Sequence, residues 1–216
     1  MTVPSLVIMA SGRGSNAQAI LDRIADGYIP ATCAAVITDN PDAYVIERAR
    51  TAGVPVSVVP FRSFPNREAY EDRLIETICG YDPDLVVLAG YMRILGSGIV
   101  RMFAGRMINI HPSLLPAFSG LHAQEQAIRY GVKVAGCTVH FVTEEMDAGP
   151  VIIQRTVPVL DGDTGETLAG RILEEEHTAL PEAVRLFCEH RLEITGRLVR
   201  VLSTEENCPS PQGTGA

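Results

Sequence analysis

The fold follows from one stretch near the N-terminus, Leu6-Val-Ile-Met-Ala-Ser-Gly-Arg-Gly-Ser-Asn16. Residues 6–9 are apolar without alternation, which is typical of a parallel strand covered on both faces. Glycines then permit a tight turn, and Ser15 and Asn16 favour the start of a helix with apolar residues at helical spacing beyond them. The stretch therefore predicts a strand, a turn and a helix in succession.

The same alternation continues through the first half of the chain. Short apolar runs predict strands at 32–37, 54–58, 85–89 and 107–110, and amphipathic stretches predict helices at 42–52 and 66–79. Alternating units at this spacing predict an α/β fold with an open, mostly parallel, Rossmann-like sheet and helices on both faces. Ligands of such sheets bind beyond the carboxyl ends of the strands.

The second half of the chain has a different pattern. Residues 111–121 hold two prolines and a glycine, so we expect an ordered loop there. Beyond it, the sequence predicts a short helix at 122–130, long strands at 136–143 and 150–159, a long helix at 164–191 and a hairpin at 192–202. The long strands place antiparallel pairs toward the C-terminal edge of the sheet. The tail, 203–216, is rich in Pro, Ser and Gly and is expected to be disordered.

Composition narrows the class of protein. The 216 residues include 18 Lys+Arg and 26 Asp+Glu, a net charge of −8, and 46% are hydrophobic. This balance favours a globular protein and argues against a nucleic-acid tract or a basic membrane patch. The longest apolar run is five residues, against roughly 20 for a membrane helix. Five cysteines without a Cys-x-x-Cys pair, and no visible secretory signal, favour a reducing cytoplasm.

The glycine turn at 11–16 is the first candidate site. Free N–H groups at a helix start attract anions, so a phosphate could bind there. The turn also satisfies Gly-x-Gly-x-x-Ala through Gly12, Gly14 and Ala17, and Asp39 follows the next predicted strand. A dinucleotide-binding oxidoreductase is therefore one alternative. A simple glycine turn with a helix cap is the other.

Three polar residues form the second candidate site. Asn109 and His111 lie two apart in a predicted strand and so project from the same face. An amide and a histidine suit oxyanion stabilisation and proton transfer near neutral pH. Asp147, between the two long strands, could orient His111 or move a proton itself. The competing interpretation is a hydrated strand end and a solvated turn aspartate.

Other chemistries find little support. The five histidines show no metal-ligand spacing, so no metal is expected, and no Gly-x-Ser-x-Gly marks a serine hydrolase. The acidic run 174–176 on the late helix is most simply a solvated face, from which one carboxylate could point at a ligand.

Four ordered motifs carry a resemblance to a known family. They are Ser11-Gly-Arg-Gly-Ser-Asn16, Leu88-Ala-Gly-Tyr-Met-Arg-Ile-Leu95, Asn109-Ile-His-Pro-Ser-Leu-Leu-Pro116 and Gly136-Cys-Thr-Val-His-Phe-Val-Thr-Glu-Glu-Met-Asp-Ala-Gly-Pro-Val151. With these, the chain up to about residue 190 resembles the phosphoribosylglycinamide formyltransferase family, the folate-dependent transformylases of purine synthesis. The sequence departs from the family at Ala117 and Ser119, where a basic residue and a proline are frequent.

The resemblance implies an activity and a set of site residues. The family transfers a formyl group from the cosubstrate 10-formyltetrahydrofolate to glycinamide ribonucleotide. The residues it implies are Asn109, His111 and Asp147 for catalysis, Gly14, Ser15, Asn16 and Glu176 for the ribonucleotide, and Arg67, Met92, Arg93, Ile94, Leu95, Asn109, Val142, Thr143 and Asp147 for folate. We accordingly expect one formyltransferase domain over 1–202, with 1–110 as its nucleotide-phosphate half and 111–202 as its folate and catalytic half.

Rival activities stay open at this point. Formyltetrahydrofolate hydrolase would use a similar triad on water, but typically carries a further N-terminal domain, for which we see no room before Leu6. Methionyl-tRNA formyltransferase usually adds an RNA-binding domain and a basic surface, and this chain is acidic. A non-catalytic nucleotide sensor would keep only the glycine turn. We expect small-molecule substrates in the cytoplasm, no nucleic acid or membrane partner, and leave a homodimer open.

Overall fold

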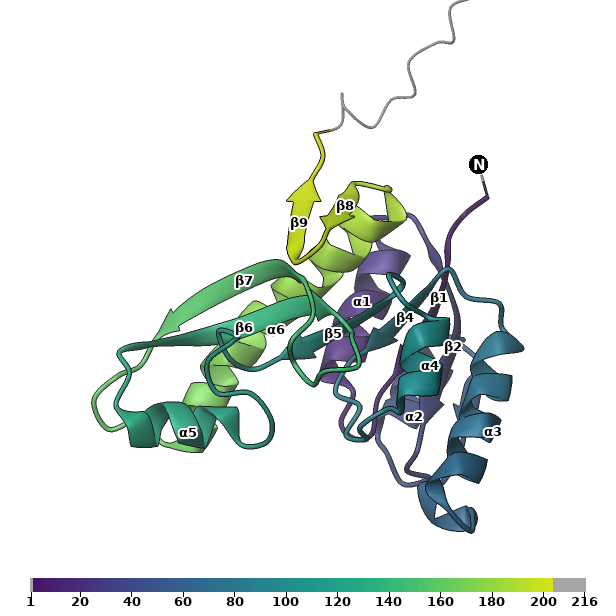
Figure 1. The fold of residues 1–216 in the computed structure, drawn as a ribbon, viewed down its shortest axis with the longest axis horizontal. Helices are drawn as coiled ribbons and strands as arrows, with labels where there is room; N and C mark the ends of the chain where they lie inside the picture. The colour runs from purple at the N-terminus through teal and green to yellow at the C-terminus, as the bar shows by residue number, and fades with distance from the viewer. Residues whose placement is uncertain (1, 204–216) are drawn as a thin grey trace, which may run out of the picture.

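A twisted sheet forms the centre of the molecule (Figure 1). The computed structural model describes residues 2–203, and its main sheet has the strand order β3-β2-β1-β4-β5-β6-β7. The strands are β1 Ser5–Met9, β2 Thr32–Thr38, β3 Val56–Val58, β4 Leu85–Leu88, β5 Met107–His111, β6 Val134–Phe141 and β7 Val151–Pro158. The first five pair in parallel, whereas β6 is antiparallel to both β5 and β7. The predicted mostly parallel sheet with an antiparallel C-terminal edge is confirmed.

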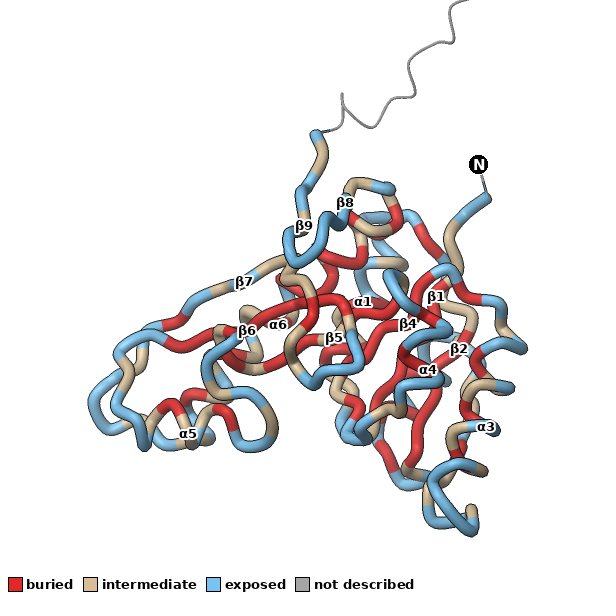
Figure 2. Tube along the Cα trace, viewed as in Figure 1, coloured by how far each residue is buried: buried red, intermediate tan, exposed pale blue. Residues whose placement is uncertain are grey.

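Helices cover both faces of the sheet. On one face α1 (Ser15–Ala25), α2 (Val45–Thr51), α5 (Ala123–Tyr130) and α6 (Gly165–Cys188) bury apolar side chains in a large cluster. On the other face α3 (Arg67–Cys79) and α4 (Ser97–Met102) enclose a smaller cluster. Alternate residues of the central strands enter the two clusters, Ile8 the larger and Val7 the smaller, which is why these strands are apolar throughout. The central strands are buried along most of their length (Figure 2).

Several local features differ from the predictions. Helix α4 was not predicted, and β3 is shorter than the predicted strand at 54–58. Helix α1 is preceded by Gly14 in the left-handed conformation, with no side-chain cap from the predicted Ser15 or Asn16. The predicted hairpin forms as β8 (Leu192–Thr195) and β9 (Leu198–Val201). A short 3-10 helix, Phe61–Ser63, lies between β3 and α3. The tail predicted to be disordered lies, from 204 onward, outside the described residues.

The topology brings four strand ends to one margin. Met9 pairs with both Ile37 and Leu88, and Leu88 pairs with Asn109. The segments that follow β1, β2, β4 and β5 therefore leave the sheet side by side. Between residues 2 and 203, no helix is long and apolar enough to cross a membrane.

Candidate active site

His111 and Asp147 meet at this margin. Nδ1 of His111 lies 3.4 Å from Oδ2 of Asp147, within ion-pair range for a protonated imidazole. Both side chains are largely buried, so little solvent screens the attraction between them. The expected convergence of the end of β5 with the loop between β6 and β7 is thus observed.

The loop after β5 holds the other sides of this pair. Nε2 of His111 lies 3.0 Å from the carbonyl oxygen of Phe118, so this nitrogen donates its proton to the loop. The backbone N–H of Gly120 donates to Oδ2 of Asp147 at 2.8 Å. The loop itself is fastened to β6 through Thr138, whose hydroxyl donates to the carbonyl of Ser113 at 2.7 Å. Backbone groups therefore fix the histidine and the carboxylate relative to each other.

Asn109 lies on the same face of β5 and has a partner on β6. Its Nδ2 is 3.3 Å from Nε2 of His140, and Nδ1 of His140 is 2.9 Å from the carbonyl oxygen of Phe141. A carbonyl can only accept, so Nδ1 carries the proton and Nε2 accepts from the amide of Asn109. Burial lowers the pKa of His140, which favours this neutral form. The Asn109 amide is thereby held in one orientation.

The loop that carries Asp147 has a constrained backbone. Asp147 has φ of +53°, a left-handed conformation that costs energy in a residue other than glycine. At Gly149 a Cβ would overlap the carbonyl oxygen of Phe141. The glycine lets the loop approach β6 closely enough to aim Asp147 at His111.

The glycine turn presents free backbone donors. Helix α1 begins at Ser15, and the first N–H to bond back within it is that of Gln18, to the carbonyl of Gly14. Gly14 has φ of +67°, and a Cβ there would overlap the side chain of Val45. The absence of a side chain at Gly14 therefore lets the turn pack against Val45 at the start of α2.

Asn16 and Glu176 come together beside this turn. Nδ2 of Asn16 donates to Oε2 of Glu176 at 2.7 Å, and both residues are buried. Oδ1 of Asn16 is buried without a hydrogen-bond partner in the structure. Burial raises the pKa of Glu176, and the bond from Asn16 opposes that rise. Glu176 is therefore no solvated face residue, but a buried polar group bonded to Asn16.

The segment Met92–Leu95 follows β4. In the sheet β4 lies between β1, which leads into the glycine turn, and β5, which carries Asn109 and His111. Met92 and Ile94 are 70% and 67% exposed, so this segment presents two large apolar side chains to solvent. The N–H of Met92 donates to the hydroxyl of Ser11 at 2.9 Å, which ties the segment to the glycine turn. Arg67 donates to the carbonyl of Ile94 at 3.0 Å.

The remaining predicted folate residues border the same margin. Leu95 and Val142 pack at the edge of the smaller apolar cluster. The N–H of Val142 donates to the carbonyl of Met107, so this residue extends the sheet beside β5. Thr143 is exposed and donates to the carbonyl of Glu145 at 3.1 Å. Asn109 lies on β5, which is between β4 and β6 in the sheet.

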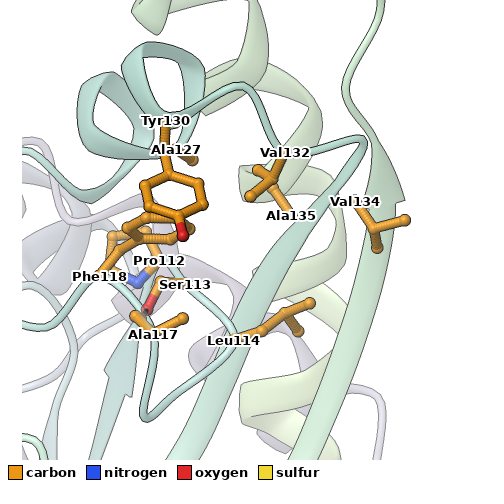
Figure 3. Close-up of a pocket in the computed structure, with 10 residues that line it drawn as sticks. All are labelled: Pro112, Ser113, Leu114, Ala117, Phe118, Ala127, Tyr130, Val132, Val134 and Ala135. Carbon is orange, nitrogen blue, oxygen red and sulfur yellow. Dashed lines mark hydrogen bonds between the residues drawn. The ribbon is translucent and has the colours of Figure 1, made fainter.

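A separate apolar pocket of about 410 Å³ lies behind the loop that holds His111 (Figure 3). It is bounded by that loop, helix α5 and strand β6, and the rings of Tyr130 and Phe118 meet there edge to face, with centroids 5.8 Å apart. None of the predicted catalytic, ribonucleotide or folate residues lines it. Over residues 2–203, no cluster of three or more His, Cys, Asp or Glu side chains could hold a metal ion.

Comparison with known proteins shows the family of this chain. The family model for formyl transferases matches residues 5–184, which is most of the chain. The chain belongs to the formyl transferase family. Among its relatives in this family is the phosphoribosylglycinamide formyltransferase of Escherichia coli (strain K12), 45% identical over 190 residues that cover 88% of this chain and 90% of that protein.

Solved formyl transferase structures have the same fold. The glycinamide ribonucleotide transformylase 1 from Symbiobacterium toebii is 53% identical, with a TM-score of 0.91 over 93% of this chain and 95% of that one. A formyltetrahydrofolate deformylase from Pseudomonas syringae pv. tomato is 30% identical, with a TM-score of 0.88 over 94% of this chain but 67% of that one. The similarity is thus greater, and covers more of the other chain, for the transformylase.

Three contributors to the site were not predicted. The backbone of Phe118 and Gly120 gives no signal in a sequence, because any residue carries a carbonyl and nearly any an N–H. The third contributor is His140, whose Nε2 accepts from the amide of Asn109. Its register opposite Asn109 on β6 could have pointed to this contact.

Proposed function

We propose that this chain transfers the formyl group of 10-formyltetrahydrofolate to the amine of glycinamide ribonucleotide in purine synthesis. The observation that carries the proposal is the meeting of His111 and Asp147, 3.4 Å apart, beside Asn109 on the same face. Family membership and the transformylase relatives support it. A cytoplasmic location, which the sequence favours, belongs to the same proposal.

The proposed reaction needs only groups present at this margin. The amine nitrogen of the ribonucleotide attacks the formyl carbon, and the carbonyl electron pair moves onto oxygen. Asn109 donates to that oxyanion, and a protonated His111, charge-stabilised by Asp147, supplies positive charge beside it. Asp147, directly or through water, carries the proton from the attacking nitrogen to the folate nitrogen as the old C–N bond breaks. The products are the formamide and tetrahydrofolate.

The two substrates occupy neighbouring parts of the margin in this proposal. The phosphate would bind Gly14, Ser15 and Asn16, and Glu176 would accept from the ribose hydroxyls. The folate would lie along the segment of Met92, Arg93, Ile94 and Leu95, with Val142 and Thr143 opposite and Arg67 near its glutamate tail. The charged His–Asp pair would then sit where the two ligands meet.

We propose a single functional domain over 1–202. Its two halves, 1–110 and 111–202, share the sites: Glu176 from the second half bonds Asn16 from the first. The segment following β4 belongs to the first half although it is assigned to folate. Each half therefore depends on the other for a complete site.

One competition assay tests the proposed function. Purified chain is given 10-formyltetrahydrofolate with glycinamide ribonucleotide, with water alone, or with initiator tRNA, and the formylated product and tetrahydrofolate are measured. We expect fast transfer to the ribonucleotide, with slow release of formate in its absence. Formate release at an equal rate without an amine would favour the hydrolase, which the deformylase likeness makes the second candidate. Ligand binding without turnover would indicate a nucleotide sensor.

A further inference from the structure

Asp39 lies at the same margin but has no part in the proposed chemistry. It follows β2, and its side chain is only 4% exposed. Oδ2 accepts from Nε of Arg93 at 2.7 Å. The sequence offered Asp39 as the acid of a dinucleotide site, yet its carboxylate is directed to an arginine of the predicted folate segment.

Arg93 is held from two sides. Its Nε is bound to Asp39, and its guanidinium carbon lies 4.6 Å from the centre of the Phe61 ring. The stacked ring and the carboxylate fix the plane of the guanidinium and its rotation within that plane. Within residues 2–203, the two terminal nitrogens of Arg93 make no hydrogen bond, and the side chain is 41% exposed. They are available to oxygen atoms of a ligand.

The pair is poorly suited to a purely stabilising role. Oδ1 of Asp39 is buried with no hydrogen-bond partner, so part of the cost of burying the carboxylate is not compensated. A bidentate pair would have used both oxygens and two guanidinium nitrogens. Here Arg93 is bound through Nε alone. Its terminal nitrogens are therefore not used by Asp39, and Oδ1 of Asp39 is left without a hydrogen bond.

We propose that Asp39 is a positioning residue for the formyl donor. It holds Arg93 so that the terminal guanidinium nitrogens bind a carbonyl or carboxylate oxygen of the folate. The inference rests on the proposed function, because it takes a folate as the ligand. The opposite role would be neutralisation, in which Asp39 weakens the attraction of Arg93 for an anionic donor, and the two roles predict opposite changes in affinity.

The test is a double-mutant cycle on Asp39 and Arg93. Asp39→Asn keeps the shape of the side chain and removes its charge, and Arg93→Met keeps an apolar stem of similar length. We expect Asp39→Asn to raise KM for 10-formyltetrahydrofolate, and Kd for tetrahydrofolate by calorimetry, roughly tenfold, the scale of one charge-assisted hydrogen bond. KM for the ribonucleotide and kcat should change less than twofold. The double variant should bind no more weakly than Arg93→Met.

Two further variants separate positioning from general damage. Asp26→Asn removes an exposed aspartate–arginine pair, with Arg23 at 2.8 Å, and should leave all constants unchanged. Phe61→Leu removes the stacked ring and should raise the same KM as Asp39→Asn, which tests the inference even when Asp39→Asn does not fold.

Several results would overturn the inference. Unchanged or tighter donor binding by Asp39→Asn excludes positioning, and tighter binding indicates neutralisation. Equal rises in both KM values indicate a structural role, as does a full additional loss in the double variant. If the wild-type chain binds tetrahydrofolate but transfers no formyl group, the proposed function fails and the cycle is still decided by Kd. Absence of any folate binding overturns both.

Discussion

The imidazole of His111 and the carboxylate of Asp147 face each other at 3.4 Å although a loop, a helix and a strand separate them in the chain. The contact depends on two backbone groups, the carbonyl of Phe118 and the N–H of Gly120, which hold the far side of each residue. Because the His111 proton on Nε2 is already bound, a second proton on Nδ1 would face Asp147 directly. Nδ1 of His111 is therefore the nitrogen directed at the carboxylate of Asp147.

Removing either member of this pair should reduce turnover with little effect on binding. We expect His111→Ala and Asp147→Asn each to lower kcat by roughly 10²–10⁴-fold, the usual scale for acid–base groups. Steady-state kinetics with both substrates saturating would measure it. Circular dichroism and urea unfolding would show whether the variants keep the fold. Full turnover in either variant would remove that residue from the mechanism.

The buried pair of Asn16 and Glu176 should control nucleotide affinity. Asn16→Ala removes the bond at 2.7 Å and leaves a buried carboxyl without its donor, so we expect KM for the ribonucleotide to rise roughly tenfold. Saturated kcat should fall far less, because the pair binds ground state and transition state alike. Asp22→Ala, on the exposed side of the same helix, removes only the bond from Gln18 at 2.8 Å and is the matched control. An equal loss in both variants would contradict the assignment.

Buried His140 should make stability depend on pH. Desolvation lowers the pKa of His140 below the ordinary 6.5. Just below pH 6.5, this histidine therefore binds a proton in the unfolded chain but not in the folded chain. The free energy of unfolding should therefore fall as pH decreases from 6.5, until the folded pKa is passed. The loss is about 1.4 kcal/mol for each unit between the two pKa values.

Urea unfolding at pH 7.5, 6.5 and 5.5 would measure this effect. His140→Gln should flatten the slope, because it removes the titrating group while keeping a donor for Phe141. The exposed His122 is the control, and His122→Gln should leave the slope unchanged. The neighbouring side chains of His111 and Asp147 are unchanged in both variants. A slope that is the same in wild type and His140→Gln would refute the assignment.

Two glycine substitutions should have opposite effects. Gly149→Ala brings a methyl group onto the carbonyl of Phe141, so the loop carrying Asp147 must shift. We expect lower stability and a large loss of kcat. Gly170→Ala, in α6 with open space around it, should stabilise the chain by about 0.5–1 kcal/mol. Thermal unfolding and kinetics on both variants would check this, and normal kcat in Gly149→Ala would exclude the constraint.

The sequence was most informative where apolar pattern and burial coincide. The central strands are apolar on both faces, so the parallel sheet could be predicted from runs such as residues 6–9 and 85–88. Helix α4 could not, since its six residues begin with Ser97 and Gly98 and span less than two turns. The start of α1 was assigned to side-chain capping, whereas the left-handed Gly14 does this without a cap.

The side chains of the candidate site could be predicted from the sequence, but the contacts between them could not. Asn109, His111 and Asp147 follow from strand ends and from family resemblance, and the first two share a face as period-two spacing requires. The contact between Asp39 and Arg93 could not be predicted in this way. Asp39 follows β2, whereas its partner Arg93 follows β4. Which side chains meet across strand ends depends on strand order, and the sequence pattern leaves that order open.

The bond between Asn16 and Glu176 also has a consequence for biosynthesis. One partner is among the first residues to leave the ribosome, and the other lies 160 positions later, in the last long helix. A nascent chain that has completed only the five parallel strands still lacks the carboxylate. This contact between α1 and α6 can therefore form only when synthesis of the chain is nearly finished.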